Sequence, residues 1–97
     1  MKIRIQFTDQ DIANGKHGSV QESPLALAFR RWVERDGDAL THLSVTHRLF
    51  VWQVQGDPAV HRATVPMDYR QEFLEAMYGG CEWSTYEWDS EGETKDV

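Results

Sequence analysis

Polar and apolar residues alternate without interruption from Lys2 to Phe7, so that every second side chain is Ile or Phe. In an extended chain successive side chains point to opposite faces, and this pattern predicts a half-buried β-strand. The order Thr8-Asp9-Gln10-Asp11 then predicts a short capped helical turn, with Thr8 as its N-cap. Asn14-Gly15 is expected to end this turn, because both residues tolerate positive φ. Residues 15–22 are polar and are expected to form a loop.

The strongest helical pattern begins at Ser23-Pro24, where serine is a preferred N-cap and proline suits the first helical position. Apolar residues then recur at spacings of three and four up to Val33 and form one stripe, and Gly37 suits the end of the helix. We therefore expect a helix that packs on a sheet through its aromatic side chains. A basic face lies outside the stripe and is formed by Arg30, Arg31 and Arg35.

The second half of the chain predicts three strands and one more helix. Leu43–Val45 and Leu49–Gln55 form two strands or one long, bent strand, and the second segment has apolar residues on both faces, which favours a central place in a sheet. Val60–Val65 is expected to return antiparallel after a turn. A helix should run from Pro66 to Tyr78, followed by a last strand at Glu82–Trp88.

The predicted order, β-α-β-β-β-α-β, corresponds to an α+β fold with a single, mostly antiparallel sheet and two helices packed on one face. A chain of 97 residues is expected to form one domain. We place that domain at residues 1–89 and predict that residues 90–97 are an acidic, frayed tail.

Charge is distributed unevenly along the chain. The formal net charge is −6, of which residues 1–80 carry −1 and residues 81–97 carry −5. This balance argues against direct nucleic-acid binding, which depends on cations that neutralise phosphates. It fits either a partner with a basic surface or a solubilising tail. The single cysteine, Cys81, and the lack of any apolar run long enough for a membrane span predict a cytoplasmic protein with no membrane contact.

Residues with catalytic potential are few, and we expect neither an enzyme nor a cofactor. Asp9 and Asp11 are the nearest approach to an acid–base pair, but their place at the start of a helical turn favours capping. Cys81 has no neighbouring base that would activate it. The histidines are His17, His42, His47 and His61, and none has a metal-ligand spacing. The last three would form a possible metal site only if the strands brought them together in space.

Aromatic and acidic residues are interleaved near the C-terminus, as expected of an interface that binds a basic partner. The alternative is an ordinary last strand whose aromatic side chains enter the core, with Trp83 equally suited to either place and Trp88 partly exposed. The candidate contact residues are Glu82, Trp83, Tyr86, Glu87, Trp88, Asp89, Glu91 and Glu93. A second candidate surface is the arginine face of the first long helix, for which a solvated face is the simpler interpretation.

Two segments of the chain carry a resemblance to small proteins encoded by tailed bacteriophages. Asp11-Ile12-Ala13-Asn14-Gly15 matches a D-I-x-x-G turn, and the residues from Ser23 to Arg31 match a C-P-x-A-x-A-x-x-R helix, with serine in place of cysteine. Val65-Pro66, Phe73 and the final predicted strand extend the likeness over most of the chain. The family has no assigned activity, so no functional residue is carried over.

The resemblance implies a phage accessory protein. By analogy of class, we expect a non-enzymatic inhibitor of a host nucleic-acid-handling defence complex, such as an anti-CRISPR protein or DNA mimic. Its partner would be a host protein or ribonucleoprotein complex with a basic surface, and the chain itself would be a monomer or homodimer. One alternative is a phage assembly or regulatory adaptor that binds through the face formed by Arg30, Arg31 and Arg35. The other is a small enzyme.

Overall fold

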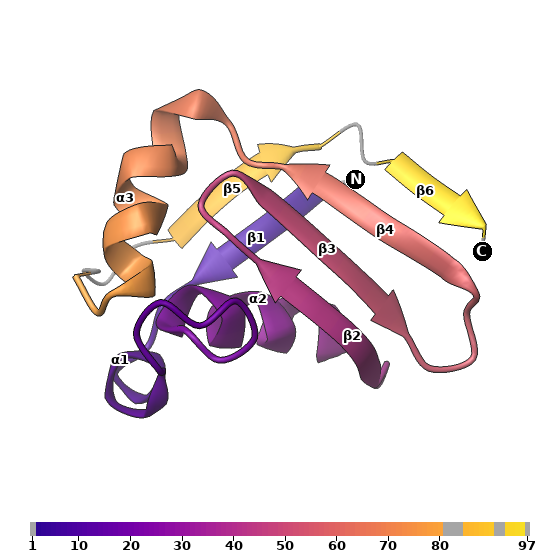
Figure 1. The fold of residues 1–97 in the computed structure, drawn as a ribbon, viewed down its shortest axis with the longest axis horizontal. Helices are drawn as coiled ribbons and strands as arrows, with labels where there is room; N and C mark the ends of the chain where they lie inside the picture. The colour runs from indigo at the N-terminus through magenta and orange to yellow at the C-terminus, as the bar shows by residue number, and fades with distance from the viewer. Residues whose placement is uncertain (1, 81–84, 91–92, 97) are drawn as a thin grey trace.

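The computed structural model describes residues 2–80, 85–90 and 93–96 and has an α+β fold in which all paired strands are antiparallel (Figure 1). The class predicted from the sequence is therefore confirmed. The elements are β1 (Lys2–Gln6), α1 (Asp9–Asn14), α2 (Pro24–Glu34), β2 (Leu40–Val45), β3 (Leu49–Val54), β4 (Ala59–Thr64), α3 (Met67–Met77), β5 (Thr85–Asp89) and β6 (Glu93–Asp96).

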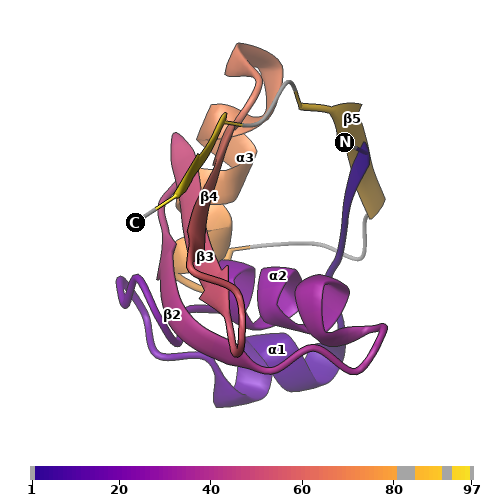
Figure 2. The same cartoon turned by 90° about the vertical axis from the view of Figure 1, so that its right-hand side faces the viewer.

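The prediction of a single sheet is wrong, because the described strands form two. One has the order β2-β3-β4-β6 and the other consists of β1 and β5 alone. Figure 2 shows these sheets on opposite sides of the molecule, with α2 across the space between them at the bottom of the view. The alternation in β1 specifies that one face is buried, but a second sheet facing the first satisfies that pattern equally well. Two helices on one face are not confirmed either, since α2 contacts both β1 and β2.

The core lies between the two sheets and is built around Phe73 of α3, which is fully buried. Five aromatic rings have their centroids 5.0–6.3 Å from the ring of Phe73. They come from both sheets, from α3 and from the segment after β1, and are Phe7, Phe50, Tyr69, Tyr86 and Trp88. Aromatic contacts therefore join the two-stranded sheet to the four-stranded one through a single helical side chain.

Two of the three predicted helix starts have the side-chain caps that their sequences indicate. Thr8 and Asp11 form a reciprocal capping box at α1, and Ser23 accepts a hydrogen bond from the Ala26 amide at the start of α2. Gly15 is needed for a reason other than the expected one. Its φ is −69°, which any residue adopts, but a Cβ at this position would lie 2.5 Å from the ring of Pro24. The glycine therefore allows the close approach of the chain to the start of α2.

One segment of the predicted acidic tail is described as a further strand. Glu93–Asp96 form β6, which pairs with β4 in antiparallel register, so that β4 is not at the edge of its sheet there. The predicted central position of β3 is confirmed, because it lies between β2 and β4. No helix formed by the residues that the structure describes has the length and apolar character to cross a bilayer.

Candidate functional site

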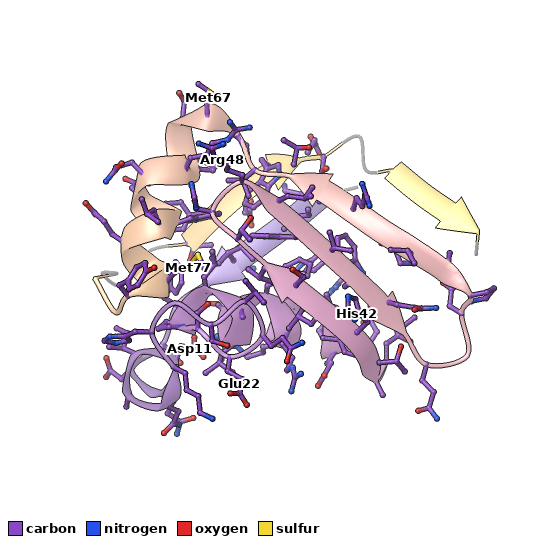
Figure 3. The ribbon with its side chains drawn as sticks, viewed as in Figure 1. Asp11, Glu22, His42, Arg48, Met67 and Met77 are labelled. Atoms are coloured by element: carbon purple, nitrogen blue, oxygen red, sulfur yellow. The ribbon has the colours of Figure 1, made fainter. Side chains whose placement is uncertain are left out.

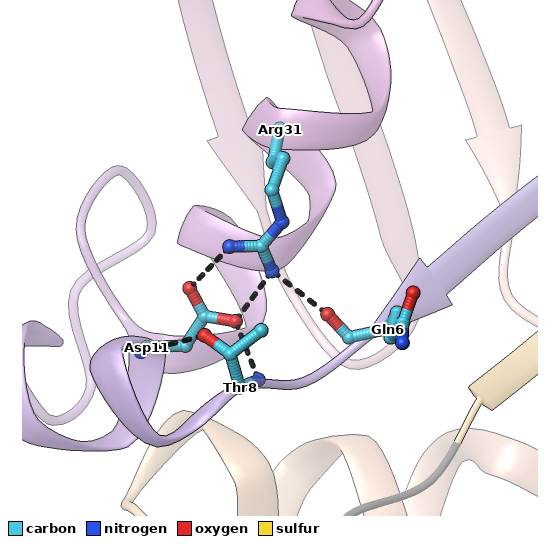
Figure 4. Close-up of polar contacts among 4 residues, drawn as sticks. All are labelled: Gln6, Thr8, Asp11 and Arg31. Carbon is cyan, nitrogen blue, oxygen red and sulfur yellow. Dashed lines mark hydrogen bonds and ion pairs between the residues drawn. The ribbon is translucent and has the colours of Figure 1, made fainter.

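The most elaborate polar cluster joins Asp11 of α1 to Arg31 of α2 (Figure 4). Arg31 donates two hydrogen bonds to the Asp11 carboxylate, 3.0 Å to Oδ1 and 2.6 Å to Oδ2, and a third of 2.8 Å to the Gln6 carbonyl. The Thr8 amide donates to the same carboxylate over 2.9 Å. Only 4 % of the Asp11 side chain is exposed, against 49 % for Arg31. The hydrogen bond to Asp11 raises the pKa of Arg31 above its ordinary value.

This cluster acts as a structural joint. Its carboxylate accepts from a backbone amide and from both terminal nitrogens of Arg31, which is the bidentate geometry that Arg and carboxylate prefer. The contact ties α1 and the end of β1 to α2. Asp11 therefore has the capping role that the sequence favoured over acid–base catalysis, and Asp9 is exposed in the same helical turn.

The predicted arginine face carries less free charge than its sequence implies. Besides the contact between Arg31 and Asp11, Arg30 lies 4.0 Å from Glu34 and Arg35 lies 3.8 Å from Asp36. The guanidinium of Arg35 also lies over the ring of Trp32, 4.2 Å from its centroid. Each arginine of this face thus has an acidic neighbour, which offsets the field that would attract an anionic partner.

Two aromatic residues of the predicted C-terminal interface, Tyr86 and Trp88, face the core. Tyr86 and Trp88 are partly buried on β5 and pack against the ring of Phe73, so the partial exposure expected of Trp88 is confirmed. The acidic residues of this strand face solvent, and Glu87 lies 3.5 Å from both Lys2 and Arg4 of β1. Three predicted contact residues, Glu82, Trp83 and Glu91, lie outside the described residues, and Glu93 is described only as part of β6.

The histidines are not gathered into a site. His42 lies on β2 and His61 on β4, on either side of β3. His61 stacks on Trp52 with 5.4 Å between ring centroids and lies 3.3 Å from the carboxylate of Asp57. Hydrogen bonds from the Ala59 amide and from His61 lower the pKa of Asp57. Within the described ranges no three His, Cys, Asp or Glu residues could hold a metal ion together, and Cys81 falls outside them.

A basic groove that the sequence analysis missed lies beside the N-terminal end of α3. It consists of two adjoining hollows of about 590 and 410 Å³, which share Met67 and Arg70 in their walls. Arg62 of β4 lines the larger hollow, and Arg48, from the turn between β2 and β3, lines the smaller. Figure 3 shows Arg48 and Met67 close to one another at the start of α3. We call this surface the arginine groove and define it by Arg48, Arg62 and Arg70.

Arg48, Arg62 and Arg70 differ from the other described cations, because no carboxylate of the described side chains lies within 4.0 Å of them. Among the described side chains, every other lysine and arginine lies within 4.0 Å of a carboxylate. Arg70 is positioned by the protein itself, because it donates to the Val65 carbonyl over 3.1 Å and contacts the Met67 sulfur at 3.2 Å. It retains further N–H groups that can donate to a ligand.

The wall of the larger hollow also contains Trp88, whose indole N–H is buried and makes no hydrogen bond within the part of the chain that the structure describes. A buried donor without a partner is rare in native proteins and calls for a physical reason. Asp89 and Ser90 follow Trp88 in the same wall. The groove is therefore mixed in character, with both arginines and apolar side chains in its lining.

Sequence patterns could not have revealed this groove, because its three arginines come from a turn, a strand and a helix and are separated by unrelated spacings. The only local signal was the composition around Val65-Pro66, which identified the start of α3. No protein-family model, curated protein or solved structure matches the chain. The resemblance to phage accessory proteins therefore stays a prediction.

Proposed function

We propose that this chain is a non-catalytic binding protein that holds an anionic partner in the arginine groove. The observation that supports this proposal is the convergence of Arg48, Arg62 and Arg70 on one concave surface, where no carboxylate of the described side chains lies within 4.0 Å of their guanidinium groups. Guanidinium groups are preferred for binding carboxylates and phosphates, because their planar N–H groups match two oxygens at once.

The charges around these three side chains leave them able to attract an anion. Residues 1–80 carry a net charge of only −1, and Asp89 is the one acidic residue among the described residues that line the two hollows, against three arginines. On the arginine face of α2 the same number of guanidinium groups is offset by Asp11, Glu34 and Asp36. An approaching anion is therefore attracted more strongly by the groove than by that helix.

The test compares two double variants with the same change in charge. Arg48→Gln/Arg62→Gln removes cations from the groove, and Arg4→Gln/Arg30→Gln removes two exposed cations that already have carboxylate neighbours. Tagged wild type and both variants are used to capture proteins from nuclease-treated lysate, with the captured species quantified by mass spectrometry. We expect the groove variant to retain less than a tenth of a partner that wild type and the control variant hold equally, because hydrogen bonds to charged groups contribute about 1.5–3 kcal/mol each.

Circular dichroism and urea unfolding show whether both variants are folded. Both substituted groove arginines are exposed, and no hydrogen bond of their side chains connects them to other described residues, so the fold should persist. Equal capture by the two double variants would contradict the proposal. Capture that persists at high salt would contradict it as well, since exposed charges are screened under those conditions.

A second candidate function is inhibition of a host nucleic-acid-handling complex by the acidic C-terminal segment. The specific observation in its favour is the pairing of β6 with β4, which gives this acidic segment a fixed backbone position at the edge of the four-stranded sheet. Truncation after Ser90 removes β6. Loss of a basic partner on truncation, with capture unchanged in Arg48→Gln/Arg62→Gln, would favour this function over the groove.

A further inference from the structure

We infer that the anionic partner is a protein, and that it enters the arginine groove as an extended acidic segment with apolar side chains between its acidic ones. This inference rests on the proposed function and names the class of ligand for the same groove. It depends on three features: the apolar side chains in the lining of the groove, the strand already paired beside it, and the orientation of the aromatic residue in its wall.

The lining of the groove contains apolar as well as basic side chains. Leu49 and Pro66, both half-buried, line the larger hollow, and Met67, which is 76 % exposed, lines both hollows. A ligand made only of charged groups would leave this apolar surface in contact with water. Side chains alternate between the two faces of an extended peptide, so a peptide with alternating acidic and apolar residues can satisfy the arginines and cover the apolar lining together.

The chain itself pairs an acidic segment with β4 next to the groove. β6 has the sequence Glu-Thr-Lys-Asp, and its register places Glu93 opposite Arg62, one of the three arginines that define the groove. The backbone of β4 is thus compatible with an extended acidic segment lying beside it. A partner segment in the groove would contact Arg62 from the side of the larger hollow.

A nucleic acid suits the groove less well. Single-stranded nucleic acids are usually held by aromatic side chains whose faces are open for stacking on bases. The aromatic residue here, Trp88, already packs against Phe50, Tyr69 and Phe73, with centroids 5.7–5.9 Å from its own ring. The net charge of −6 also repels a long polyanion, whereas a short acidic segment meets mainly the local field of the arginines.

The experiment selects ligands for the folded, full-length chain from two random libraries, one of displayed dodecapeptides and one of single-stranded DNA and RNA. We expect the selected peptides to be enriched in Asp and Glu at alternate positions, with Leu, Val, Ile or Phe between them. A fluorescent selected peptide should bind Arg48→Gln/Arg62→Gln at least tenfold more weakly than wild type or Arg4→Gln/Arg30→Gln. NMR shifts on binding should centre on Leu49, Met67 and the indole N–H of Trp88.

The outcomes separate this inference from the proposed function. If oligonucleotides bind more tightly than the selected peptides, with the same dependence on Arg48 and Arg62, the inference is wrong and the groove still binds anions. Peptides without acidic enrichment that bind through the groove would also overturn the inference. If neither library yields a ligand whose affinity depends on these arginines, the proposed function fails together with the inference.

Discussion

At the scale of single residues, Arg31 has the largest structural role of any cation in the described chain. It contacts a carboxylate that is almost completely buried, so removal of the guanidinium leaves Asp11 with a charge and without its principal partner. We expect Arg31→Gln to lower the free energy of unfolding by about 1–3 kcal/mol, below the cost of breaking a fully buried pair because Arg31 is half exposed. Urea denaturation followed by tryptophan fluorescence measures this change.

The neighbouring arginine provides the control for that measurement. Arg30 lies one position away on α2 and has an exposed carboxylate neighbour, Glu34, at 4.0 Å. Exposed pairs at this helical spacing contribute about 0.5 kcal/mol or less, so Arg30→Gln should leave the unfolding midpoint nearly unchanged. Equal destabilisation by the two substitutions would show that the joint between α1 and α2 contributes no more than a surface ion pair.

Asp57 gives a prediction about pH. Its pKa in the folded chain is lowered from the ordinary 3.8 by hydrogen bonds from the Ala59 amide and His61. A lowered folded pKa means that the ionised carboxylate stabilises the fold above the unfolded pKa, and that this stabilisation disappears as the pH falls through the folded pKa. Asp57→Asn should therefore be less stable than wild type at pH 5–7, and the difference should shrink as the pH falls below the ordinary carboxyl pKa of about 4.

Urea midpoints for both proteins across this pH range test the expectation. Asparagine keeps an oxygen that can accept from the Ala59 amide, so the comparison isolates the charge rather than the turn itself. A constant difference between the two proteins down to pH 2 would contradict the assigned cause.

At the scale of elements, the sequence was informative wherever the controlling residues are neighbours in the chain. Thr8 with Asp11, and Ser23 with Pro24, specify two helix starts through hydrogen bonds and φ preferences that act within four residues. The strand that pairs with β1 is determined by residues far away in the sequence. Ile3 faces Trp88 and Ile5 faces Tyr86 across more than eighty residues of chain, and no local preference encodes that choice. For this reason the strands were predicted but their division into two sheets was not.

The candidate site illustrates the same limit. The three arginines on α2 are close in sequence and were found at once, yet their acidic neighbours offset them in the fold. Arg48, Arg62 and Arg70 are far apart in sequence, and only the meeting of the β2–β3 turn, β4 and α3 brings them to one groove. Charge pairing in three dimensions, rather than charge density in sequence, decides which cations are available to a partner.

β6 allows a prediction about local stability. Among the described elements it contacts only β4, so its removal should leave the core intact. We expect a chain truncated after Ser90 to fold, with hydrogen exchange accelerated at the amides of residues 59–62 and little changed in β1, β2 and α2. Mass spectrometry or NMR of exchanging amides provides the measurement. Acceleration throughout the four-stranded sheet would show that β6 stabilises more than its own ladder.

At the scale of the whole molecule, Phe73 connects the two sheets. It is fully buried, and its ring contacts aromatic side chains from β3 and β5, on opposite sides of the core. Phe73→Ala should cost about 3–5 kcal/mol, a large part of the stability of a domain of this size. Leu74→Ala, at a half-buried position on the same helix, should cost no more than about half as much. Urea unfolding of both variants tests whether the core depends on this junction.

The pairing of β1 with β5 has a consequence for the order of events during synthesis. β1 leaves the ribosome first, but its hydrogen-bonding partner begins at Thr85, and the aromatic residues that cover Phe7 and Phe73 come with that partner. Closing so long a loop carries a high entropic cost, which is recovered only when the contacts at its end form. The nascent chain thus holds an amphipathic strand without its partner until β5 has been synthesised. Completion of the fold waits for that strand, and the apolar side of β1 is the surface that a chaperone would contact before then.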